Sequence, residues 1–173
     1  MVVLRPAGAT SLKSTKEKAQ SGLSLPNKVW YFAYGSNLNP DQMNKRVGEW
    51  HLSKRALARN YRLAFNVFSA EWQGNTANLL ETGRFEDTVY GVVYLLNEEQ
   101  FLKLQKHERV APVEIHLELE DGNEISRAKA FIWSSTTKER PPPEPYRRTM
   151  EAGLLQHGYK KSLVDKVLGK AEK

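Results

Sequence analysis

The hydrophobic residues of this chain fall into short runs and alternating stretches, which are typical of β-strands. Residues 29–34 form a nearly continuous apolar run, so we expect a strand that is buried on both faces. A hairpin is predicted where Ile115, Leu117 and Leu119 alternate with polar residues ahead of an Asp-Gly-Asn turn. The pattern predicts strands over these segments: 29–34, 56–67, 76–83, 87–97 and the two arms of a hairpin over 112–135.

Helix signals separate these strands. Asn39 is a good N-cap and Pro40 suits the first helical position, so a helix is predicted from there to about Val47. Asn97 is predicted to cap a second helix over residues 98–108. We expect this second helix to face the core with three residues: Phe101, Leu102 and Leu104.

The C-terminal third begins with a proline-rich segment, residues 136–145, which cannot form a regular element and favours an extended conformation. Two helices are predicted after it, one over 146–158 that ends at Gly158 and one over 160–170. Strands that precede helices in this order favour an α+β fold with a small, curled, mostly antiparallel, barrel-like sheet and flanking helices, rather than a doubly wound parallel sheet.

The length of 173 residues suits one domain, which we expect over residues 28–173. Residues 1–27 show little periodicity and are expected to be an N-terminal extension, flexible or packed late. They lack the apolar stretch of a signal peptide, and no apolar run in the chain is long enough to span a bilayer. The chain has no cysteine, which excludes disulfides and thiolate chemistry, and we expect a cytoplasmic protein without membrane partners.

The formal net charge of +6 raises the possibility of an anionic partner such as nucleic acid. The basic residues are scattered in short patches, and none forms a block of five or six like charges. A solvated basic surface is therefore favoured over a nucleic-acid site.

The first predicted strand runs directly into a Gly-Ser-Asn turn that leads to the capped helix. Gly35 allows the backbone to turn where a Cβ would clash. The amides of Gly35, Ser36, Asn37 and Leu38 are then able to point into one space, which suits a carboxylate or a developing oxyanion. An ordinary strand–loop–helix connection without a ligand has the same sequence, and the residues alone favour that simpler interpretation.

Several motifs along the chain resemble one family in the same order. The segment YFAYGSNL at 31–38 resembles the signature of the γ-glutamylcyclotransferase family, also called AIG2-like. Further matches are RALARNYRLAFN, TANLLETG, DTVYGVVYLLNEEQFLKLQKHE and PPPEPYRRTMEAGLLQHG, so the resemblance covers residues 29–160. It implies a small barrel-like α+β fold. It also implies release of a γ-glutamyl group as 5-oxoproline without a metal or other cofactor.

The resemblance assigns roles to particular residues. Glu108 matches the glutamate of the family motif LDxxEG, the general acid/base, although Gln105 and Arg109 replace the Asp and the Gly. Without the family, Glu108 would be expected to be a surface glutamate at a helix end. The residues that match the family loop, and are expected to bind substrate, are Tyr34, Gly35, Ser36, Asn37 and Leu38.

Tyr146 matches a pocket tyrosine of the family, and the alternative is a tyrosine that anchors the proline-rich segment. Two other family tyrosines are missing, at the region of Pro112 and Val113 and at Phe131. A site that binds a polar substrate discriminates through such hydroxyl groups. The sequence therefore does not identify the leaving amine.

The sequence thus predicts an enzyme that forms 5-oxoproline from a small γ-glutamyl amine or peptide, as a monomer or homodimer. The alternatives are a relative that binds such a metabolite without turnover, and a protein that binds nucleic acid through its basic surface. The four histidines lack metal-ligand spacing, and of these His107 is a candidate for the mouth of the pocket.

Overall fold

The computed structural model describes residues 27–169. The predicted N-terminal extension lies outside the described residues except for Asn27, so the division into an extension and a domain stays a prediction. Within residues 27–169, none of the helices has the length and apolar character that a membrane crossing requires.

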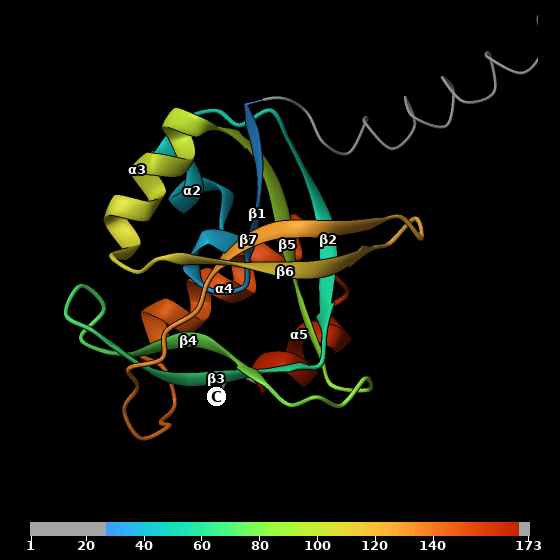
Figure 1. Ribbon diagram of the computed structural model, residues 1–173. Coiled ribbons are helices and arrows are strands. Elements are labelled where there is room, and N and C mark those ends of the chain that lie inside the picture. The colour runs from blue at the N-terminus through green and yellow to red at the C-terminus, as the bar shows by residue number, and fades with distance from the viewer. Residues whose placement is uncertain (1–26, 170–173) are drawn as a thin grey trace, which may run out of the picture.

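Five strands close into a small barrel in the order β1-β5-β2-β6-β7 (Figure 1). All neighbouring pairs are antiparallel except β1 and β7, which close the barrel through a parallel contact between Tyr31 and Lys129. The α+β, mostly antiparallel prediction is confirmed. The strands are β1 (Lys28–Ala33), β2 (Leu52–Arg59), β5 (Thr88–Asn97), β6 (Pro112–Leu119) and β7 (Glu124–Phe131).

The single strand predicted over residues 56–67 is wrong, because the chain turns at Asn60 and forms two strands. Asn60 has φ 69°, a left-handed conformation that asparagine tolerates better than most residues. Its amide and carbonyl bond to Asp87 and Thr82. The second strand, β3 (Tyr61–Ser69), leaves the barrel and pairs only with β4 (Gly74–Glu81), as a separate hairpin below it in Figure 1.

Both predicted helix starts are confirmed. The side chain of Asn39 accepts bonds from the amides of the first turn of α2 (Pro40–Val47), just after the short 3-10 helix η1 (Ser36–Leu38). Asn97 forms a reciprocal capping box with Gln100 at the start of α3 (Glu98–Glu108).

The predicted core side of α3 needs one correction. Phe101 and Leu104 are buried, but Leu102 is 56% exposed. Leu102 follows Phe101 directly, so it points about 100° around the helix from it and away from the barrel.

Residues 136–143 of the proline-rich segment form no regular element, as predicted, and the backbone there bonds to β3 at Asn66 and Phe65. The last two residues of the predicted segment, Glu144 and Pro145, instead begin the next helix. The helices α4 (Glu144–Gln156) and α5 (Lys161–Leu168) follow residues 136–143, and Gly158 takes a positive φ of 88° between them. Helix α4 packs on η1, so the last third of the chain supports the loop that follows β1 (Figure 1).

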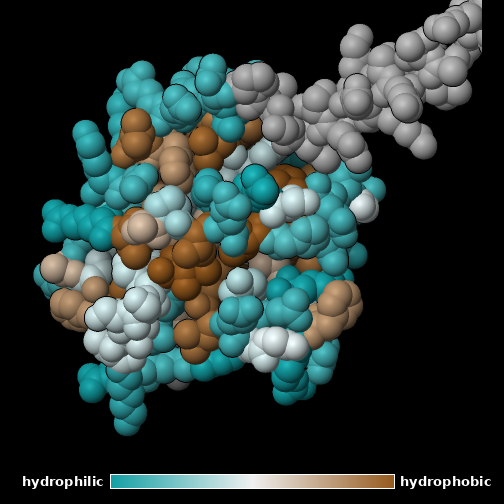
Figure 2. All heavy atoms as spheres, in the orientation of Figure 1, coloured by the Kyte–Doolittle hydropathy of each residue, from teal (hydrophilic) through white to brown (hydrophobic). Residues whose placement is uncertain are grey.

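The core fills the barrel and the space beneath α3 and α4. The C-terminal half of β1 is buried, but its first three residues are only partly so, which limits the prediction of a strand buried on both faces. On the face of Figure 2, apolar side chains gather where β7 and the β3–β4 hairpin come together, and polar side chains surround them.

Candidate active site

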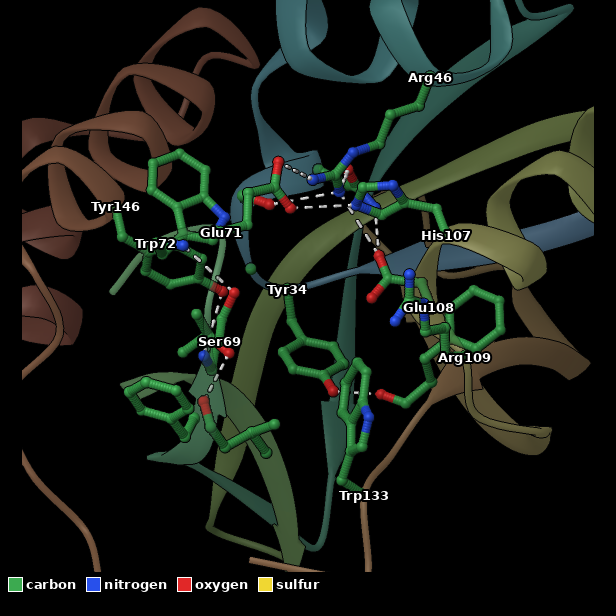
Figure 3. A pocket seen from close by; sticks show the side chains of 18 of the residues that line it. Tyr34, Arg46, Ser69, Glu71, Trp72, His107, Glu108, Arg109, Trp133 and Tyr146 are labelled. Atoms are coloured by element: carbon green, nitrogen blue, oxygen red, sulfur yellow. Dashed lines mark hydrogen bonds and ion pairs between the residues drawn. The ribbon is translucent and has the colours of Figure 1, made fainter. Parts of the chain in front are cut away.

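A cavity of about 440 Å³ opens between the barrel, the end of α3 and the β3–β4 hairpin. Figure 3 shows Glu108 and the ring of Tyr34 facing this space, with Arg46 and His107 above them. Six of the seven predicted site residues line the cavity, which leaves out Leu38. The six are Tyr34, Gly35, Ser36, Asn37, Glu108 and Tyr146.

Glu108 is the last residue of α3, and Arg109 ends the helix in a left-handed conformation with φ 57°. The Glu108 side chain is only 16% exposed. Its Oε1 accepts a hydrogen bond from Nδ2 of Asn37 at 3.2 Å and lies 3.5 Å from Nη1 of Arg46. Both contacts use Oε1, and in Figure 3 the other carboxylate oxygen points into the cavity.

Burial raises the pKa of the Glu108 carboxyl above its ordinary value. The Arg46 guanidinium is the largest influence in the opposite direction, followed by His107 and the hydrogen bond from Asn37. Burial, with a smaller contribution from the Glu71 carboxylate, outweighs these three influences, so the pKa is raised. A carboxyl with a raised pKa is suited to exchange protons near neutral pH.

Asn37 connects the acid to the loop through its side chain. Its Nδ2 faces the hydroxyl of Tyr31 at 2.9 Å as well as Glu108, and its Oδ1 accepts from Nη1 of Arg46 at 2.6 Å. Its backbone carbonyl accepts from the hydroxyl of Tyr94 at 2.8 Å. Asn37 is 3% exposed, so these bonds fix its position away from bulk water.

Position 35 requires a glycine because a side chain of α4 approaches its backbone closely. A Cβ at this position would lie 2.5 Å from the hydroxyl oxygen of Tyr146, so the sequence-based argument for a clash is confirmed. The same hydroxyl accepts a bond from the amide of Ala77 at 3.1 Å. Tyr146 therefore lines the cavity and also joins α4 to the hairpin and to the loop.

The backbone amides of the loop differ in whether they are free to bind a ligand. The amides of Leu38 and Asn39 donate to the carbonyls of Gly35 and Ser36 within the turn, and the Leu38 side chain is fully buried. The expectation that the Leu38 amide points into the pocket is therefore not met. Within residues 27–169, no side chain caps the start of η1, and no backbone carbonyl accepts from the amides of Gly35 or Asn37.

At the cavity mouth, Arg46 and Glu71, which the sequence did not indicate, form a group with His107. Arg46 of α2 lies 3.7 Å from Glu71, which in turn lies 3.3 Å from His107 of α3. Arg46 is 8% exposed, and Gln42, one turn earlier, accepts from its Nη2 and Nε at 2.8 Å when the amide oxygen faces the guanidinium. Arg46 rather than the exposed Arg109 is thus the cation beside Glu108.

The two positions with missing tyrosines differ. Phe131 lines the cavity, stacks on Phe101 with ring centroids 5.7 Å apart, and accepts a bond from the Tyr34 hydroxyl at its carbonyl. Pro112 and Val113 do not line it. The absent hydroxyl at Phe131 therefore leaves an apolar wall in the cavity.

The histidines have separate surroundings. His107 lies at the cavity mouth, as the sequence suggested. His116 is half-exposed near Glu124, and His157 contacts the Tyr94 hydroxyl at 3.2 Å. No group of three potential metal ligands occurs in residues 27–169.

Comparisons with known proteins point to one family. The model of the family described as "Gamma-glutamyl cyclotransferase, AIG2-like" matches residues 31–149. The chain is 29% identical over 138 residues to a gamma-glutamylcyclotransferase of Bos taurus, covering 74% of this chain and 71% of the relative. It is 27% identical over 147 residues to one of Mus musculus, covering 79% and 76%.

Solved structures share the fold. One described as gamma-glutamyl cyclotransferase superposes with a TM-score of 0.76 at 22% identity, over 84% of this chain and 89% of the other. A yeast structure described as a cyclotransferase specific to glutathione gives 0.58 at 12% identity, over 82% and 94%. At these identities the likeness shows the fold alone.

Proposed function

The chain belongs to the gamma-glutamyl cyclotransferase, AIG2-like family, and from that premise we propose that it is an enzyme that releases 5-oxoproline from a γ-glutamyl amine or peptide. The two mammalian relatives are themselves named gamma-glutamylcyclotransferases. The proposed substrate is a small molecule that enters the cavity with its γ-glutamyl group first.

The reaction needs no nucleophile from the protein. The α-amine nitrogen of the glutamyl group attacks its own δ-carbonyl carbon, which forms the ring C–N bond and a tetrahedral oxyanion. The oxyanion then collapses, the bond to the leaving amine breaks, and a proton passes from the attacking nitrogen to the leaving nitrogen. Holding the chain in a bent conformation accelerates such an intramolecular step greatly.

Glu108 is the proposed proton carrier. Its burial and raised pKa support this role, because a base must take a proton from the attacking amine and return it to the leaving amine. Its second oxygen points into the cavity, while Asn37 and Arg46 hold the first.

The loop is the proposed oxyanion site. The amides of Gly35 and Asn37 are the proposed donors, because neither is used within the turn, in contrast to the amide of Leu38. Removal of one preorganised oxyanion-hole donor costs roughly 2.7–4 kcal/mol of transition-state stabilisation in enzymes where a side chain supplies it. Tyr34, Ser36 and Tyr146 are proposed to shape the floor and walls.

One observation carries the proposal: a buried carboxylate and a loop with available amides border the same cavity. The Asn37 side chain ties the two together at 3.2 Å. An ordinary surface glutamate at a helix end would not have this environment.

The test is 5-oxoproline release from a panel of γ-glutamyl dipeptides and amines, with wild type beside Glu108→Gln. The substitution keeps the shape and removes the titratable group, so we expect turnover to fall at least about 10²-fold, as is typical when a general base is lost. Glu99→Gln is the matched control, because Glu99 lies on the same helix with its side chain 80% exposed. Equal rates in wild type and Glu108→Gln would exclude Glu108 as the base.

Absence of turnover from every substrate, together with measurable binding of γ-glutamyl ligands, would instead support the alternative of a non-catalytic relative. A cytoplasmic location, a monomeric or homodimeric state, and no use of the basic surface for nucleic acid stay predictions of the sequence.

A further inference from the structure

The mouth of the cavity carries exposed aromatic surface. Phe68, at the end of β3, is 62% exposed and lines the cavity. Trp133, just after β7, lines it too, and its backbone is held on both sides by the Asn78 side chain at 2.9 and 3.1 Å. Figure 3 places the Trp133 ring beside Tyr34, on the side away from Arg46.

An exposed phenylalanine is not informative by itself. Phe85 is as exposed, at 64%, but it lies outside the cavity, and the Arg59 guanidinium covers its ring at 4.5 Å. Phe68 differs because it borders the space through which a substrate enters. Val67 and Phe131 extend the same apolar wall, which agrees with the apolar centre of this face in Figure 2.

The charges at the mouth divide into two sets. Arg46 and His107 both lie within ion-pair distance of Glu71. Lys106 and Arg109 also line the cavity, yet neither forms an ion pair with another of the residues 27–169. These two cations are exposed and available to an anionic group of a ligand.

We propose that this mouth is the subsite for the leaving group, and that it selects an amino acid with a large apolar side chain and a free carboxylate. With the γ-glutamyl group at Glu108 and the loop, everything beyond the leaving nitrogen extends toward the mouth. The side chain then packs on Phe68 and Trp133, and the carboxylate lies near Lys106 and Arg109. This inference rests on the proposed function and names the substrate class of the same site.

The apolar contact predicts a measurable preference. A single methylene in a hydrophobic enzyme pocket changes kcat/KM by about 10- to 200-fold. Because this subsite is open on one side, we expect γ-glutamyl-leucine to exceed γ-glutamyl-alanine in kcat/KM by about 10-fold in total. The neutral γ-glutamyl-leucinamide should fall below γ-glutamyl-leucine because it lacks the carboxylate.

The experiment measures kcat/KM for these three substrates in wild type, Phe68→Ala and Phe85→Ala. Phe68→Ala should bring the leucine-to-alanine ratio close to one. Phe85→Ala, which removes an equally exposed ring outside the cavity, should keep the wild-type ratio. Lys106→Gln combined with Arg109→Gln should remove most of the difference between the leucine substrate and its amide.

A wild-type ratio of one, or a ratio that Phe68→Ala leaves unchanged, would overturn the subsite. Binding of the same ligands to Glu108→Gln by calorimetry separates this result from a failure of the proposed function. One possible outcome is that the protein turns over no substrate. If Glu108→Gln then binds γ-glutamyl-leucine about 10-fold more tightly than γ-glutamyl-alanine, the proposed subsite is supported and the proposed enzymatic activity is contradicted. Equal binding of both ligands in that case overturns the subsite as well.

Discussion

Gly35 offers a sharp test of the loop, because the structure says which atom an added methyl group would meet. An ideal Cβ at Gly35 lies 2.5 Å from the Tyr146 hydroxyl oxygen, whereas ordinary contact begins at 3.4 Å. In Gly35→Ala the loop and the hydroxyl must therefore separate by about 0.9 Å. The hydroxyl is held by the amide of Ala77, so the movement either displaces the loop or strains that hydrogen bond.

The expected cost follows from this displacement. Overpacking of a buried site destabilises a protein by about 1–3 kcal/mol. A catalytic group misplaced by about 1 Å loses on the order of 10²-fold in rate. We therefore expect Gly35→Ala to lower the free energy of unfolding by about 1–3 kcal/mol and kcat/KM for 5-oxoproline release by about 10²-fold.

A double-mutant cycle with Tyr146→Phe identifies the cause. Without the hydroxyl, the nearest atoms to the new Cβ are Ala77 Cβ at 3.5 Å and the ring carbon Cζ at 3.7 Å, both ordinary contacts. Tyr146→Phe alone leaves the Ala77 amide without its acceptor, at a cost of about 1–3 kcal/mol. The double variant should then be more stable than the sum of the two single effects.

Urea denaturation of the four proteins measures this coupling, and 5-oxoproline release measures the rate. Strictly additive effects, or a Gly35→Ala protein with wild-type stability and activity, would show that the hydroxyl does not constrain the loop.

Two other predictions concern Arg46 and the start of α3. In Arg46→Gln, the loss of the cation beside Glu108 removes the largest influence that lowers the pKa of its carboxyl, so that pKa rises. The base acts in its deprotonated form, so the acidic limb of the kcat/KM profile should move to higher pH, and an unmoved limb would contradict the role of Arg46. Asn97→Ala removes one half of the capping box and should lower the free energy of unfolding by about 1 kcal/mol in urea denaturation. No change there would mean that the cap does not contribute.

Local signals in the sequence were sufficient for most elements of the fold. Asn39 and Asn97 marked helix starts because capping depends on neighbours along the chain. The break at Asn60 was missed because the apolar alternation continues across it, and a left-handed residue between two strands leaves no gap in the pattern. The exposure of Leu102 depends on which face of α3 meets the barrel, which is set by tertiary packing.

The candidate site also contains some residues that the sequence could identify and others that it could not. The loop residues were accessible because they are contiguous, and Glu108 was found through the family motif. Arg46 and Glu71 could not be identified from the sequence, because they lie on separate elements and resemble the many other charged residues of a basic chain. Their approach to Glu108 depends on how α2, α3 and the β3–β4 hairpin pack around the cavity.

The geometry of Arg46 explains how a cation can lie beside the proposed base without disabling it. Its closest contact is to Oδ1 of Asn37 at 2.6 Å, whereas Glu108 lies at 3.5 Å. Arg46 therefore acts on Glu108 partly through the Asn37 side-chain amide, which it orients. The Arg46 guanidinium also interacts with the Glu71 carboxylate at 3.7 Å. A direct two-pronged pair would favour the ionised carboxylate far more strongly. The divided contact leaves burial as the dominant influence, so Glu108 keeps the raised pKa that proton transfer requires.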